Sequence, residues 1–122
     1  MEKWKRNYLK GILADYPHME EYIKEYEAKL LYSRAKNDGT EEILLTISDD
    51  RRLRSLEKNY LTIKECLEHS TPEVRKIIQL LYLSPRTKTD LNLTADRVFL
   101  STRQVTRLRN QFFEELAEKL GI

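Results

Sequence analysis

The chain has few of the residues that interrupt helices or cross-link chains. Its 122 residues include three glycines, three prolines and one cysteine, Cys66. A single cysteine excludes a disulfide framework and a zinc site built from several thiolates. Few helix breakers beside 34% charged residues are typical of a helical protein. We therefore predict an all-α fold.

Long apolar segments are also missing. No run approaches the roughly 18 apolar residues that a membrane-spanning helix needs. The first eight residues are mostly charged or polar, whereas a signal peptide has an apolar centre. We expect a soluble, intracellular protein without a membrane partner.

Catalytic and metal-binding patterns are absent from the sequence as well. His18 and His69 lack further ligands in register, and Cys66, with only His69 near it, is expected to be a buried thiol. The acid pairs at 20–21 and 49–50 each fall near the start of an expected helix, where the helix dipole favours them. There is no glycine-rich phosphate loop and no nucleophile motif. We predict a protein that is not an enzyme and uses no metal or cofactor.

Apolar residues recur every three or four positions along most of the chain, which predicts amphipathic helices. We expect helices at about 3–14, 17–36, 48–69, 72–82, 90–98 and 102–120. Asn37-Asp38-Gly39-Thr40 is the strongest turn signal. Segment 42–47, ambiguous between an extended piece and a short helical turn, is interpreted as a linker. We therefore predict an N-terminal helical hairpin in segment 1–47, for assembly or partner contact, and a second domain at 48–122.

Positive charge gathers near the C-terminus. The overall charge of +2 is too small to indicate a nucleic-acid partner. Segment 84–111, however, has six basic residues and two acidic ones, a net charge of +4, whereas segment 112–122 has a net charge of −2. The first of these segments is therefore where a phosphate backbone would be attracted.

Within the basic segment, the sequence predicts a short helix, a tight turn and a long helix. Thr89 or Asp90 caps the short helix, and the turn falls at Phe99–Leu100. Ser101 and Gln104 have the spacing of a capping box that begins the long helix. The small side chain of Ala95 would let the two helices approach closely.

This order of elements is that of a helix-turn-helix, in which the second helix enters the major groove of DNA. Phe99 stands at a turn position that is often glycine in such proteins, so the turn must accept a bulky side chain. The apolar stripe of the second helix is Val105, Leu108, Phe112, Leu116 and Leu120.

The polar face of the long helix supplies the candidate DNA contacts. Arginine can pair with guanine, and asparagine or glutamine with adenine. We predict that residues near its N-terminus reach bases or phosphates: Thr102, Arg103, Gln104, Thr106, Arg107 and Asn110. Lys88 and Arg109, the latter close to the apolar edge, are predicted to contact phosphates.

Other interpretations stay open. An amphipathic helix with three arginines can simply have a solvated face. The apolar stripe at 19–31 could instead pair with another helix, which would make the protein a protein–protein adaptor that does not bind DNA. Trp4, Tyr8 and the pair Tyr22 and Tyr26 could form an interface with a second copy, giving a homo-oligomer.

Two segments carry a family resemblance: Leu100-Ser-Thr-Arg-Gln-Val-Thr-Arg-Leu-Arg109 and Leu116-Ala-Glu-Lys-Leu-Gly121. They resemble the late-gene transcription activators of phages of Gram-positive bacteria, the RinA/ArpU group. A weaker similarity is Asp15-Tyr-Pro17 followed by an amphipathic helix. That group resembles the promoter-reading region 4 of bacterial sigma factors.

The resemblance implies a bundle similar to sigma-factor region 4 at 48–122, with segment 101–110 opening the recognition helix and segment 90–98 supporting it. It implies a transcriptional activator of phage packaging, structural and lysis genes. Its partners would be double-stranded promoter DNA and the host RNA polymerase, in the cytoplasm of the bacterial host cell. The chain is too short for the other regions of a complete sigma factor, so an accessory activator is expected.

Overall fold

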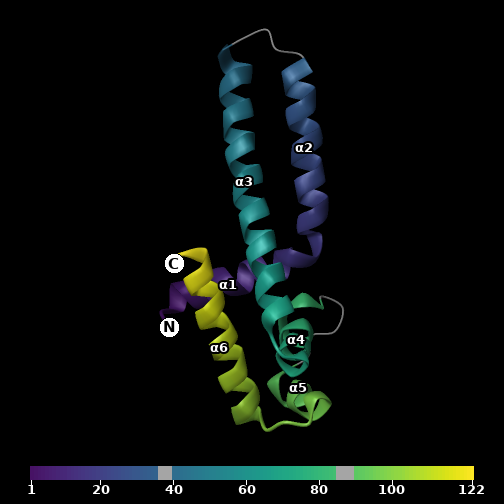
Figure 1. Ribbon diagram of the computed structural model, residues 1–122, viewed down its shortest axis with the longest axis vertical. Helices are drawn as coiled ribbons and strands as arrows, with labels where there is room; N and C mark the ends of the chain where they lie inside the picture. Colours follow the sequence, from purple (N-terminus) through teal and green to yellow (C-terminus); the bar gives the residue numbers. More distant parts are fainter. Residues whose placement is uncertain (36–39, 85–89) are drawn as a thin grey trace. The chain divides into compact units, whose positions relative to one another are not determined.

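Every secondary-structure element described in the protein is helical (Figure 1). The computed structural model describes residues 1–35, 40–84 and 90–122, and their side chains except those of 33–49. The elements are α1 (Lys3–Asp15), a 3-10 turn η1 (Tyr16–His18), α2 (Met19–Ala35), α3 (Thr40–His69), α4 (Pro72–Ile78), a π-helical turn η2 (Gln79–Leu83), α5 (Leu91–Val98) and α6 (Thr102–Leu120). The prediction of an all-α protein is confirmed.

The helices group into two compact units. One, which we call the terminal unit, comprises Met1–Pro17 and Thr62–Ile122, and the other, the α2–α3 unit, comprises His18–Leu61. The long helix α3 contributes to both. The domain boundary that the sequence suggested, between residues 47 and 48, lies inside this helix.

The interpretation of segment 42–47 as a linker is wrong. Helix α3 begins at Thr40 and continues without interruption to His69, so neither Ser48 nor Asp49 caps a helix. No glycine or proline lies between Gly39 and Pro72, so nothing in the segment stops a helix. Its β-branched residues made it resemble a strand, but such residues lower helix propensity only slightly. Of the predicted turn Asn37-Asp38-Gly39-Thr40, residues 37–39 lie outside the described residues, and Thr40 is the first residue of α3.

The core of the terminal unit is built from α1, α3, α4, α5 and α6. Its fully buried side chains include Leu9, Leu13, Ile63, Ile77, Ile78, Val105, Phe113 and Leu116. The ring of Phe113 also packs against Tyr82, with 5.3 Å between the ring centroids. Burial of each such side chain contributes about 1.5–3 kcal/mol of hydrophobic stabilisation, so α6 is firmly held along its apolar side.

Helix α1 enters this core with three apolar side chains. Leu9, Ile12 and Leu13 are buried, but Trp4 and Tyr8 are exposed. The indole nitrogen of Trp4 donates a hydrogen bond to the Glu2 carboxylate. The two aromatic rings therefore lie outside the packed stripe.

The α2–α3 unit buries little apolar surface among its described side chains. Met19, Leu30 and Leu53 are buried, whereas Leu31 is 67% exposed. The Tyr60 hydroxyl on α3 donates a hydrogen bond to the Glu20 carboxylate on α2, which ties the two helices together. Among the described residues, no helix is both long and apolar enough to cross a bilayer.

Candidate nucleic-acid interface

Helix α5 begins at a side-chain cap. The backbone N–H of Leu93 donates to the Asp90 carboxylate over 2.8 Å. Such a cap satisfies one of the N–H groups left without a partner in the first turn. The cap is thus Asp90, one of the two residues that the sequence offered.

The turn between α5 and α6 is a tight helix end centred on Phe99. Phe99 has φ 59° and ψ 39°, in the left-handed region. Its N–H donates to the Asp96 carbonyl over 3.4 Å, and the N–H of Leu100 donates to the Ala95 carbonyl over 3.1 Å. This pair of bonds is the Schellman motif, whose left-handed residue is usually glycine. The prediction that the turn must accept a bulky side chain is confirmed.

Helix α6 begins with the predicted capping box. Gln104 N–H donates to Ser101 Oγ over 3.1 Å, and Ser101 N–H donates to Gln104 Oε1 over 3.0 Å. The remaining N–H groups and the helix dipole make this end of α6 electropositive. No acidic residue lies in the first turn to neutralise it.

A small apolar cluster fixes α5 and α6 against α4. Its buried members are Ile77 on α4, Ala95 and Val98 on α5, and Val105 on α6. Partly buried leucines surround it: Leu80, Leu81, Leu91, Leu100 and Leu108. Because Val105 is fully buried, the N-terminal half of α6 has one fixed orientation in the terminal unit.

That orientation leaves the strongest donors pointing outward. Thr102, Arg103 and Arg107 are exposed, and the two arginines are one helical turn apart. Among the described residues, neither arginine has a hydrogen bond or an ion pair. Their guanidinium groups are therefore available to an anion or to a hydrogen-bond acceptor.

Three other predicted contact residues have groups already engaged within α6. Gln104 is exposed, but its Oε1 accepts from Ser101 N–H in the capping box. The Thr106 hydroxyl donates to the Thr102 carbonyl over 2.9 Å, and Asn110 Oδ1 accepts from Arg109 over 3.3 Å. Thr106 and Asn110 are also half-buried. These side chains are therefore weaker candidates for contacts to a nucleic acid than the two exposed arginines.

Arg109 is directed toward the interior, in agreement with its predicted place at the apolar edge. The residue is half-buried, and its Nε is buried with no hydrogen-bond partner in the described part of the chain. Its guanidinium also contacts Tyr82. Burial raises the pKa of the Tyr82 phenol, and the charge and hydrogen bond of Arg109 partly offset that rise. Lys88, the other predicted phosphate contact, lies outside the described residues.

Sequence reasoning did not assign a role to several residues that define this region. Phe99 is 92% exposed, which helical periodicity does not reveal for a turn residue. Lys76 Nζ on α4 donates to the Arg97 carbonyl over 3.4 Å, a favourable position for a cation at the C-terminus of α5. Thr94 is fully buried, and its Oγ1 has no hydrogen-bond partner among the described residues.

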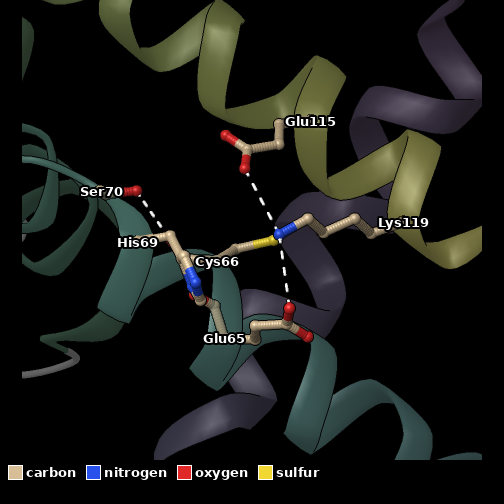
Figure 2. Close-up of polar contacts among 6 residues, drawn as sticks. All are labelled: Glu65, Cys66, His69, Ser70, Glu115 and Lys119. Atoms are coloured by element: carbon tan, nitrogen blue, oxygen red, sulfur yellow. Dashed lines mark hydrogen bonds and ion pairs between the residues drawn. The ribbon is translucent and has the colours of Figure 1, made fainter.

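The other polar cluster of the terminal unit joins α3 to α6 (Figure 2). Lys119 Nζ lies 3.5 Å from Glu115 and 3.8 Å from Glu65, and Ser70 Oγ donates to the Cys66 carbonyl over 2.6 Å. Cys66 is fully buried, as expected, and burial raises the pKa of its thiol despite the nearby Lys119 charge. A thiol in this state is a poor nucleophile. The described part of the chain holds no group of three or more His, Cys, Asp or Glu placed to bind a metal.

The α5–α6 region thus combines a fixed helix, an electropositive helix start and outward arginines. Segment 97–111 contains no acidic residue. Such a surface suits an anionic partner that has hydrogen-bond acceptors. No protein-family model, no curated protein and no solved structure matches the chain, so its role is inferred from its own residues.

Proposed function

We propose that α5 and α6 form a helix-turn-helix and that the protein is a sequence-specific DNA-binding transcriptional activator. The observation that carries the proposal is the pair Arg103 and Arg107. Both are exposed in the first two turns of a helix whose opposite side is buried. The N-terminal part of a recognition helix is the part that meets base edges.

The geometry of α6 supports different DNA contacts for its different polar residues. Arg103 and Arg107 can each donate two hydrogen bonds to a guanine. Gln104 offers only its amide nitrogen while its oxygen stays in the capping box, so it would donate to a base or phosphate but not pair bidentately with adenine. Exposed Thr102 can contact a phosphate or a base edge.

The finer assignment rests on the family resemblance. We propose that the protein activates phage late genes together with the host RNA polymerase, in the bacterial cytoplasm. In this arrangement α4, η2, α5 and α6 form a bundle similar to region 4 of a sigma factor. The α2–α3 unit and the exposed Trp4 and Tyr8 of α1 are left for assembly or partner contact.

The test begins with selection of a binding site from a pool of randomised DNA duplexes. Gel shifts on the selected duplex then compare the wild type with Arg103→Ala, Arg107→Ala and the double variant over a range of salt concentrations. A base-reading arginine should cost about 1–3 kcal/mol of binding free energy and relax preference at one base position. The control is Arg51→Ala with Arg52→Ala on α3, which removes the same number of charges from exposed residues.

The control separates a specific interface from a general effect of charge. We expect the control variant to bind the selected duplex nearly as well as the wild type. Equal binding by the Arg103/Arg107 double variant and the wild type would overturn the proposed interface. Failure of the selection to enrich any sequence would overturn sequence-specific binding.

A second candidate function is supported by the α2–α3 unit. An open groove of about 590 Å³ is lined by Tyr22, Glu25, Tyr26, Lys29, Arg52, Ser55 and Leu56. Aromatic and apolar side chains beside charges of both signs are suited to an amphipathic helix of a protein partner. The protein would then be an adaptor that does not bind DNA. Binding to duplex DNA that weakens steeply with salt would exclude an adaptor of this kind.

A further inference from the structure

Phe99 combines two features that are each unusual. Among the described residues other than glycine, it alone has a positive φ. The residue is also 92% exposed, more than any other large hydrophobic residue whose side chain is described. Both features are found at the turn that joins α5 to the basic helix α6.

Neither the fold nor the turn explains a phenylalanine at this position. The left-handed conformation crowds a Cβ atom against the backbone, and glycine avoids that crowding. A ring that remains in water gains no burial to offset the strain. The backbone hydrogen bonds of the turn, from Phe99 and Leu100, do not require a side chain.

The surroundings of Phe99 indicate what the ring could meet. Two exposed arginines, Arg97 and Arg103, flank it in the sequence, and it stands two residues before the N-cap Ser101. If the start of α6 enters a major groove, the residues that immediately precede its cap, Phe99 among them, lie beside the strand that borders the groove. Along that strand, charged phosphates alternate with apolar deoxyribose rings. An apolar ring between two cations is complementary to this alternation.

We propose that Phe99 is a DNA contact residue whose ring packs on a deoxyribose of the strand bordering the groove. The inference rests on the proposed function of α6 and adds a contact that is apolar and not ionic. It differs from the arginine contacts in a measurable way. Loss of an ionic contact flattens the dependence of affinity on salt, whereas loss of an apolar contact lowers affinity equally at every salt concentration.

The experiment uses Phe99→Gly and Phe99→Asn, because both residues adopt the left-handed conformation readily. Gel shifts on the duplex selected by the wild type, over a range of salt, are compared with those of Arg103→Ala. We expect each Phe99 variant to bind about fivefold more weakly, the effect of a partly buried ring, with the salt dependence of the wild type. Leu31→Ala, which shortens an exposed apolar side chain of the α2–α3 unit, is the matched control and should bind normally.

The outcomes distinguish this inference from the function on which it rests. If the wild type binds the duplex and the Phe99 variants bind equally well, Phe99 does not contact DNA. If they bind DNA normally but fail to activate transcription by added polymerase, the ring contacts a protein and the inference is wrong. If the wild type shows no salt-dependent DNA binding, the proposed function fails, and this inference fails with it.

Discussion

Two helices of the terminal unit end in the same backbone motif but with different residues. Helix α5 ends at Phe99 with φ 59°, and α6 ends at Gly121 with φ 78°. In the second motif, Gly121 N–H donates to the Glu118 carbonyl over 3.1 Å, and Ile122 N–H donates to the Ala117 carbonyl over 3.0 Å. These bonds have the same pattern as those that follow α5. One end uses the residue that favours this conformation, and the other does not.

The difference separates what the fold requires from what it only tolerates. A Cβ atom at Gly121 would meet no atom within 4 Å, so glycine is favoured there by its backbone alone. The same backbone preference acts at Phe99, yet a large exposed ring occupies that position. Local rules that fail at one position while the surrounding structure obeys them often mark a functional site. The comparison therefore points to the α5–α6 turn, beside the arginines of α6.

The largest expected effect is on the free energy of unfolding, when the buried Phe113 and the exposed Phe99 are each replaced by alanine. Phe113→Ala should lower the free energy of unfolding by about 3–5 kcal/mol, because it removes a ring that is 1% exposed and packs on Tyr82. Phe99→Ala should change it by no more than about 0.5 kcal/mol, since the left-handed strain stays and the ring touches little. Urea denaturation of both variants measures the difference. A loss at Phe99 comparable to that at Phe113 would mean that the exposed ring supports the fold.

The next largest effect on stability is expected at Gly121, the glycine that ends α6. Gly121→Ala should destabilise the protein by about 1 kcal/mol, because alanine is strained at positive φ. Gly11, within α1, is the matched control: a Cβ there also meets no atom within 4 Å, but φ is not positive. Gly11→Ala should therefore stabilise the protein by about 0.5–1 kcal/mol. Equal changes in the urea midpoint for both variants would show that the backbone conformation of Gly121 does not cause the loss of stability.

Local patterns in the sequence were sufficient to predict the helices and caps of the α5–α6 region. The Ser101–Gln104 capping box, the extent of α6 and the turn at Phe99–Leu100 all depend on residues within a few positions of each other. Capping and helical periodicity act over that range. For the same reason the sequence located the outward arginines of α6 correctly.

Features that depend on tertiary packing could not be predicted in this way. The start of α3 was misplaced because periodicity alone cannot assign a short apolar run such as 43–47 to a strand or to a helix. The burial of Thr94 and the contact of Arg109 with Tyr82 depend on which helices pack together. The exposure of Phe99 has the same origin, because it becomes apparent only once α5 and α6 are assembled and none of the described helices covers the residue.

The smallest expected effect is a gain in stability at Phe99, opposite in sign to the effects expected at Phe113 and Gly121. Phe99→Gly relieves a strain of about 1–2 kcal/mol but gives the unfolded chain more freedom, which offsets about 0.4–1 kcal/mol. The variant should therefore be more stable than the wild type by about 0.5 kcal/mol, visible as a higher urea midpoint at an unchanged m-value. A more stable variant that binds DNA less well would show that the ring serves binding at the expense of the fold. A less stable variant would instead show that the ring packs in the folded protein, and the contrast with Gly121 would lose its functional meaning.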